Sequence, residues 1–140
     1  MRKEAIVRIT GIQRGENGAE ERVTSEAFGS YQFREDCHYL EYRERTDDGD
    51  EQENYVALTE ERLTVRKKGK IDTEMLFLPA CTTAAEYQTP YGVIPIEIET
   101  FSVRYKLTKR KLLAQVSYIL KMNGSFVSEN KLRIEAEWRN

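Results

Sequence analysis

The segment 87–101 constrains the fold more than any other part of the sequence. It begins with a Pro-Tyr-Gly corner at 90–92 and continues into a run in which Ile94, Ile96 and Ile98 share one parity, with glutamates following on the other. Proline fixes φ in the turn range, and glycine accepts a positive φ that bulkier residues resist. Strict alternation is typical of a β-strand with one buried face. The segment therefore predicts a strand, a tight corner and a second strand.

The apolar phase of this second strand changes near Thr100. Beyond it, Phe101, Val103 and Tyr105 continue the apolar pattern on the opposite parity. A single extra residue restores the phase, because a β-bulge shifts the register by one residue and bends the strand. We expect a bulge around 99–100, and bent strands are what a closed barrel requires. Two short strands with an ordinary bend are the alternative.

The rest of the chain has the pattern of further strands joined by turns. Strong turn sequences are Asn17-Gly18, an acidic Asp-Gly turn over 46–50, and Asn123-Gly124. Gly29 interrupts the second strand, where a bulge or a barrel corner fits. Strand patterns cover residues 2–14, 22–33, 37–46, 53–60, 63–65 and, after a turn at Lys68-Gly69, 71–77, followed by 112–122 and 126–139. The sequence predicts one domain over residues 1–140, an up-and-down antiparallel barrel of about eight to ten strands, with a sandwich as the alternative.

The charge pattern argues against several classes of partner. The net charge of −2 comes from 22 basic and 24 acidic residues, which are interspersed along the chain. We therefore predict no nucleic-acid partner and no anionic membrane partner. No apolar stretch is long enough for a signal peptide or a membrane span, so we expect a cytoplasmic protein with Cys37 and Cys81 as thiols.

Few residues are suited to metal binding or catalysis. His38 is the one histidine, and the two cysteines do not form a Cys-x-x-Cys pair. A zinc site needs more nitrogen or sulfur ligands than this, so we predict neither a metal nor a cofactor. Cys37 and His38 are adjacent on a strand and face opposite sides, so they do not form a nucleophile and base pair. The sequence favours a protein that is not an enzyme.

Several motifs together resemble a known family. They are Tyr87-Gln88-Thr89-Pro90-Tyr91-Gly92, the downstream Thr100, and the strand Leu40-Glu41-Tyr42-Arg43-Glu44 followed by an acidic glycine turn. This pattern is similar to the YwiB-like family of small uncharacterised bacterial proteins, over nearly the whole chain. The resemblance implies a lipocalin-like, calycin-type barrel, and it brings no assigned catalytic residues.

A barrel of this size either fills its interior with side chains or holds one small ligand. The expected inward positions are largely apolar: Tyr42, Glu44, Met75, Phe77, Ile96, Ile98, Tyr118, Leu120, Ile134 and Trp138. Such a lining suits a small apolar or amphipathic molecule, although it also suits a packed core. The residues predicted to bind a ligand are Tyr42, Glu44, Tyr87, Thr89, Tyr91 and Trp138.

Two points stay open at this stage. Glu44 needs a partner if it faces inward, because an unpaired buried carboxylate is costly, and Arg66, Arg104 or a tyrosine hydroxyl could supply it. The favoured alternative is that Glu44 lies near the barrel rim and pairs across strands. The alternative function is a solid barrel that binds a protein partner, or forms a homodimer, through an outer face around Tyr55 and Phe101.

Overall fold

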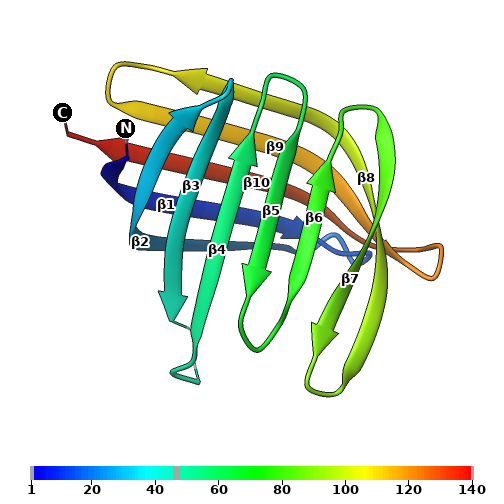
Figure 1. The fold of residues 1–140 in the computed structure, drawn as a ribbon. Coiled ribbons are helices and arrows are strands. Elements are labelled where there is room, and N and C mark those ends of the chain that lie inside the picture. Colours follow the sequence, from blue (N-terminus) through cyan, green and yellow to red (C-terminus); the bar gives the residue numbers. More distant parts are fainter. Residues whose placement is uncertain (1, 46–47, 140) are drawn as a thin grey trace.

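A computed structural model describes residues 2–45 and 48–139, and all regular structure among them is antiparallel β (Figure 1). No helix in this part of the chain is long and apolar enough to cross a membrane. Residues 46 and 47 of the predicted acidic turn lie outside the described residues. The strands are β1 (Lys3–Arg14), β2 (Glu20–Arg34), β3 (Cys37–Arg45), β4 (Glu51–Leu58), β5 (Leu63–Lys68), β6 (Thr73–Phe77), β7 (Cys81–Thr89), β8 (Gly92–Leu107), β9 (Lys111–Met122) and β10 (Ser125–Trp138).

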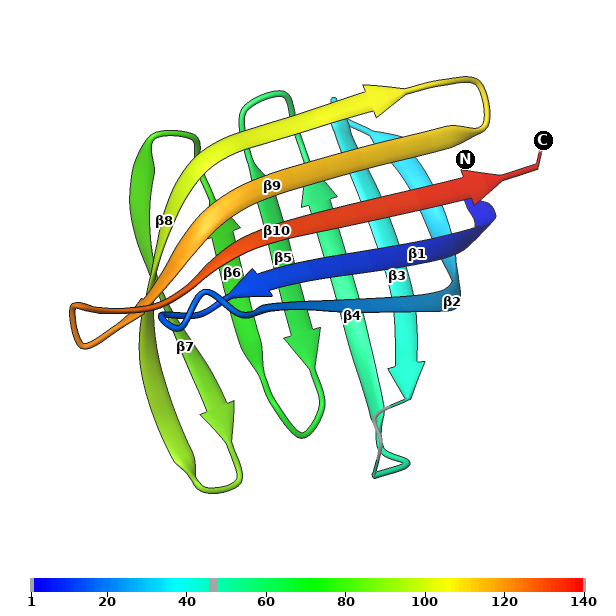
Figure 2. The same cartoon turned by 180° about the vertical axis from the view of Figure 1, so that it is seen from behind.

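The strands form one sheet that curls into a nearly closed barrel. Its order is β6-β5-β4-β3-β2-β1-β10-β9-β8-β7, so the first and last strands pair with each other. The edge strands β6 and β7 are consecutive in the chain and lie against each other (Figures 1 and 2). Asp72 and Gln88 bridge them through two backbone hydrogen bonds of 2.9 and 2.8 Å. The predicted up-and-down antiparallel barrel is confirmed.

The strand alternation places the apolar face inside the barrel. The apolar residues expected to face inward from the sequence all belong to the core or pack against it. Val7, Phe77 and Ile98 at its centre are fully inaccessible to solvent. Burying one such side chain contributes about 1.5–3 kcal/mol. The middle of the barrel is therefore filled with side chains.

Gly29 lets β2 leave β1 and turn onto β3. Strand β2 pairs with β1 through residues 20–31 and with β3 through residues 29–34. A Cβ atom at Gly29 would lie 2.2 Å from the Glu41 carbonyl oxygen and 2.9 Å from the Tyr42 Cβ. Only glycine allows this approach, so the predicted barrel corner is confirmed.

The predicted bulge in β8 is also present. The register between β8 and β9 shifts between Thr100 and Ser102, so that Thr100 pairs with Tyr118 and Val103 pairs with Val116. The shift leaves Phe101 half exposed and turns Tyr105 and Leu107 toward the barrel interior. This strand, like β9 and β10, bends strongly as it crosses the barrel (Figure 2).

The corner at 90–92 is a tight hairpin tip. Thr89 pairs with Gly92, whose φ of 135° is in the range that favours glycine. The Thr89 hydroxyl donates to the Gly92 carbonyl at 2.8 Å and accepts from the Tyr91 amide at 3.1 Å. Thr89 therefore stabilises the corner itself.

We expect Gly29→Ala to lower the free energy of unfolding by about 3 kcal/mol, because the added methyl group overlaps the backbone of β3. The matched control is Gly11→Ala on β1, where an added Cβ meets no atom within 4 Å. Urea denaturation of both variants measures the difference. Equal stability of the two variants would contradict the close approach at Gly29.

Candidate functional site

The connections between consecutive strands alternate between the two ends of the barrel, so each end carries its own set of turns. At one end lie the start of β1, the end of β10 and the turns after β2, β4, β6 and β8. An open cleft of about 800 Å³ lies at this end, and we call it the mouth cleft. It is lined by Phe33, Glu35, Asp36, His38, Thr59, Glu60, Glu61, Tyr105 and Leu107.

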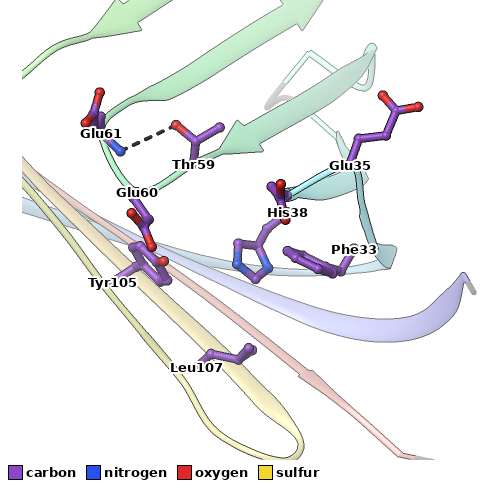
Figure 3. Close-up of a pocket in the computed structure, with 9 residues that line it drawn as sticks. Phe33, Glu35, His38, Thr59, Glu60, Glu61, Tyr105 and Leu107 are labelled. Atoms are coloured by element: carbon purple, nitrogen blue, oxygen red, sulfur yellow. Dashed lines mark hydrogen bonds between the residues drawn. The ribbon is translucent and has the colours of Figure 1, made fainter.

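The floor of the mouth cleft is aromatic and apolar (Figure 3). The ring centroids of Phe33 and His38 are 4.7 Å apart, and those of His38 and Tyr105 are 5.6 Å apart. Phe33 and Leu107 are 48% and 49% exposed, although their strand positions face inward. Unlike the filled centre of the barrel, this end leaves apolar surface uncovered.

His38 is a largely buried part of this floor, and its ring points into the cleft (Figure 3). It is 5% exposed, and its Nδ1 lies 2.8 Å from the Tyr31 hydroxyl. Burial lowers the pKa of His38, because the charged ring loses hydration. The ring is therefore neutral near pH 7. The contact with Tyr31 uses Nδ1 and leaves Nε2 without a hydrogen-bond partner among the described residues.

The rim of the cleft carries four carboxylates from two turns. Glu35 and Asp36 form the two-residue turn between β2 and β3, with φ of 54° and 62°. Glu60 and Glu61 lie in the turn between β4 and β5, where the Glu61 amide donates to the Thr59 hydroxyl at 3.4 Å. None of the four forms an ion pair with any described residue. Arg62 lies in the same turn as Glu60 and Glu61, and Lys109 and Arg110 lie in the turn between β8 and β9 at this end, so the rim carries charges of both signs.

Tyr42 and Glu44, two of the residues predicted to bind a ligand, lie toward the opposite end of the barrel. The Glu44 carboxylate accepts hydrogen bonds from the Ser25 hydroxyl and the Asn54 amide, both at 3.0 Å. Tyr42 is buried beside it, and burial followed by the Glu44 charge raises the pKa of Tyr42. We call Ser25, Glu44 and Asn54 the polar cluster.

The partners of Glu44 lie on the two strands that flank β3. Arg66 and Arg104, the arginines considered from the sequence, are exposed and form no hydrogen bond or ion pair with Glu44. Their strand parity directs them outward, whereas Asn54 and Ser25 share the inward parity of Glu44. A neutral amide and a hydroxyl therefore satisfy the carboxylate across the strands, and neither arginine does.

The other predicted residues lie in separate places. Tyr87 is half-buried, with its hydroxyl 3.9 Å from the Met75 sulfur, and burial raises its pKa. Thr89 holds the hairpin corner, and Tyr91 at its tip is 97% exposed. Trp138 lies at the mouth end, stacked on Tyr31 with ring centroids 4.1 Å apart. The structure thus divides the six residues between the two ends, and their role in ligand binding stays a prediction.

None of the residues that line the mouth cleft is among the six predicted from the sequence to bind a ligand. A usable signal was present: the acidic pairs Glu35-Asp36 and Glu60-Glu61 each fall at a turn beside inward strand positions. In an up-and-down barrel, alternate turns meet at the same end. Counting turns by parity would have placed these two pairs together.

The described residues offer little for metal or thiol chemistry. No group of three or more His, Cys, Asp or Glu side chains within residues 2–45 and 48–139 is arranged to hold a metal ion. Cys37 is buried and Cys81 is exposed, and both are free thiols. The Cys37 sulfur lies 3.8 Å from the carbonyl oxygen of His38, not against its ring nitrogens.

These features define a nearly closed antiparallel barrel, an architecture that fits the calycin type, with an open cleft at one end. Residues 7–134 match the family described as a domain of unknown function, DUF1934, and the chain belongs to this family. The crystal structure of the YwiB protein from Bacillus subtilis is similar, with a TM-score of 0.88. It is 19% identical, and the match covers 99% of this chain and 94% of that chain. No curated protein matches the chain.

The resemblance to the YwiB-like family, first drawn from the Tyr87–Gly92 motif, is therefore confirmed. At 19% identity the likeness to the solved structure establishes the fold alone. The function must be argued from this chain's own residues, because one fold can host many functions.

We expect His38 to titrate below its ordinary pKa of 6.5. Between the folded-state and unfolded-state pKa values of His38, the unfolded chain binds more protons than the folded protein. The stability due to neutral His38 is therefore complete above about pH 6.5 and falls as the pH drops from there toward the folded-state pKa. NMR titration of the imidazole measures the pKa directly, because the chain has one histidine. His38→Gln should reduce the loss of unfolding free energy between pH 7 and 5. A midpoint at or above 6.5 would show that the ring is solvated.

Replacing Asn54 with aspartate should place a second carboxylate about 3 Å from Glu44. We expect Asn54→Asp to lower the unfolding free energy by about 3 kcal/mol at pH 7. One of the two carboxyl groups then has a higher pKa in the folded than in the unfolded protein. The variant therefore recovers stability at pH values below the unfolded-state pKa and loses it as the pH rises through the folded-state pKa. Asn54→Ala is the control, since it removes the hydrogen bond at every pH. Parallel pH profiles for the two variants would contradict the contact.

Proposed function

We propose that this protein is a non-enzymatic binding protein that holds a small amphipathic molecule in the mouth cleft. The observation that carries this proposal is the pair Phe33 and Leu107, which face inward but are left about half exposed by the described residues. Apolar side chains at inward positions of a barrel normally bury each other. A ligand seated between them would complete that burial.

The size and chemistry of the cleft support a small molecule. Its volume of about 800 Å³ is within the range of about 300–1,000 Å³ that ligand sites occupy. Aromatic faces from Phe33, His38 and Tyr105 would contact an apolar body, and polar groups at the rim would orient a polar end. The packed barrel centre supports a ligand at the mouth rather than deep in the interior.

Trp138 enters this proposal as a neighbour of the cleft. Its ring stacks on Tyr31, which is hydrogen-bonded to His38, so one aromatic cluster runs from Trp138 to the cleft floor. Binding at the cleft would change the surroundings of this cluster. The tryptophan is therefore a natural fluorescence reporter.

The end of the barrel opposite the mouth cleft, which holds the polar cluster, is a second candidate ligand site. Asn54 Oδ1 and Thr73 Oγ1 are buried there and have no hydrogen-bond partner among residues 2–45 and 48–139. Buried polar atoms normally find one, so these two atoms suit an ordered water or a ligand hydroxyl. Tyr42, Glu44 and Tyr87 would line such a position, and Thr89 and Tyr91 would lie at its edge.

A protein-binding outer face is the remaining alternative. Phe28 and Phe101 on the outer face are 85% and 52% exposed. Single exposed apolar side chains are common on soluble proteins, so they support this function less strongly than the cleft supports a ligand.

The cytoplasmic location expected from the sequence is kept as part of the proposal, with Cys37 and Cys81 as free thiols.

Native mass spectrometry of gently purified protein tests the proposal. We expect an added mass of small-molecule size that is absent from the denatured chain. Phe33→Ser combined with Leu107→Ser should abolish it with little change in stability, because both side chains are about half exposed. Phe28→Ser is the matched control on the outer face and should retain it.

Other outcomes assign the function differently. If only Tyr42→Leu or Glu44→Gln abolishes the added mass, the ligand binds at the end of the barrel that holds the polar cluster. If the native mass is bare and Nile red shows no fluorescence increase with the protein, the ligand proposal is wrong. A dimer that Phe28→Ser or Phe101→Ser dissociates would support the outer face instead.

A further inference from the structure

We infer that the mouth cleft selects an uncharged aromatic molecule that carries a hydroxyl group, and that His38 binds this hydroxyl through Nε2. This inference rests on the proposed function and adds the chemical class of the ligand and the residue that recognises it. It combines three observations: an imidazole held in place with one nitrogen open to the cleft, tilted aromatic rings on both sides of it, and a rim with charges of both signs.

The second ring nitrogen of His38 is open to the cleft. No described residue forms a hydrogen bond with Nε2, and this atom is not one of the solvent-inaccessible polar atoms that lack a partner in residues 2–45 and 48–139. Solvent therefore reaches Nε2, although the residue as a whole is buried. In Figure 3 the ring points into the cleft. Ligand sites typically combine apolar surface with a few placed polar groups of this kind.

Tyr31 and Trp138 hold the imidazole in this orientation. The Tyr31 hydroxyl lies 2.8 Å from Nδ1, and the Tyr31 ring stacks on Trp138 with centroids 4.1 Å apart and 3° between the ring planes. Tyr31 and Trp138 are both buried in the core. The direction of Nε2 is therefore set before a ligand arrives, and a preorganised contact loses less entropy on binding.

A hydroxyl group is the partner that fits Nε2 in either tautomer of the ring. Near pH 7 the imidazole is neutral, because burial lowers the pKa of His38. One nitrogen of a neutral imidazole donates and the other accepts, and the Tyr31 hydroxyl can take either role at Nδ1. A ligand hydroxyl can also take either role, so it matches Nε2 in both cases. A carboxylate can only accept and an ammonium group can only donate.

The rings beside His38 favour an aromatic body for the ligand. Phe33 and Tyr105 flank the imidazole at centroid distances of 4.7 and 5.6 Å, and their planes are tilted from it by 44° and 57°. A hydrogen bond to Nε2 lies near the imidazole plane, where the N–H bond or the lone pair points. Because the flanking rings are tilted, a ligand ring stacked on one of them can bring its hydroxyl to the edge of the imidazole. Contacts between aromatic rings also stabilise binding beyond the area that they bury.

The charges around the opening do not favour a charged ligand. Arg34, Arg62, Lys109 and Arg110 lie on or beside the turns at this end of the barrel, together with the four rim carboxylates. Opposite charges spread around one opening largely cancel, so the rim does not concentrate ligands of one sign. Selection then depends on the floor, whose three rings are neutral near pH 7.

The test is an NMR titration of ¹⁵N-labelled protein at pH 7 with three probes of similar size: p-cresol, toluene and 4-methylcyclohexanol. We expect p-cresol to shift the amide signals of Phe33, His38 and Tyr105 at a concentration about threefold to tenfold lower than toluene does, the range that one hydrogen bond contributes. It should also bind at least threefold more tightly than 4-methylcyclohexanol, which has the hydroxyl but no aromatic ring. The imidazole ¹⁵N signals report the contact directly, because the chain has one histidine. Only the two hydroxylated probes should shift the Nε2 signal strongly.

One variant assigns the preference to His38. His38→Phe keeps an aromatic ring and removes both nitrogens, so p-cresol and toluene should bind it at similar concentrations. Tyr39→Phe is the matched control, because Tyr39 is the next residue of β3 and packs against Arg34 on the outer face. The control should keep the preference for p-cresol. If His38→Phe does not fold, the Nε2 signal of the unmodified protein still decides the question.

The outcomes separate this inference from the proposed function. Equal binding of p-cresol and toluene at the cleft, or an Nε2 signal that p-cresol leaves unchanged, overturns the inference and leaves an apolar ligand site. Equal binding of p-cresol and 4-methylcyclohexanol overturns the selection of an aromatic body. If Tyr105→Phe removes the preference and His38→Phe does not, the role of His38 is overturned. No shift at the cleft with any probe overturns both the inference and the proposed function.

Discussion

The barrel depends on the close approach of two backbones at Gly29. With the Glu41 carbonyl oxygen 2.2 Å from where a Cβ would lie, β2 can leave β1 and cross onto β3. That turn brings the short hairpins of β3 to β6 over the long, bent strands of β8 to β10 (Figure 1). The core forms between these two halves of one sheet, and the extra residue near Thr100 supplies the complementary bend.

The same closure decides where a ligand can bind. Because side chains fill the middle of the barrel, open volume is left where strands end and turns begin. At the mouth end, the shift at the bulge brings Tyr105 and Leu107 to inward positions opposite Phe33 and His38. One irregularity in β8 therefore both bends the barrel wall and completes the floor of the cleft.

Local sequence patterns predicted the fold well and the site poorly, for a physical reason. Alternation, turn residues and a phase change act within one or two strands, so the strands, the Gly29 corner and the bulge could be read directly. The cleft combines residues from β2, β3, β8 and two turns, and its assembly depends on how the sheet closes. The partner of Glu44 was missed because an amide on the neighbouring strand, Asn54, gives no charge signal in the sequence. Tyr91 was chosen for its residue type, yet the tight corner directs it away from the barrel.

The Glu35-Asp36 turn shows how stability and function can oppose each other in this fold. A two-residue hairpin needs positive φ at both positions, and the chain meets that need at a structural turn with Asn123-Gly124. At the mouth, Glu35 and Asp36 adopt the same geometry. A positive φ costs a non-glycine residue about 1 kcal/mol or more, so this turn is less favourable than the Asn-Gly turn. The strained turn lines the mouth cleft, which places the least favourable backbone of the barrel beside its candidate ligand site.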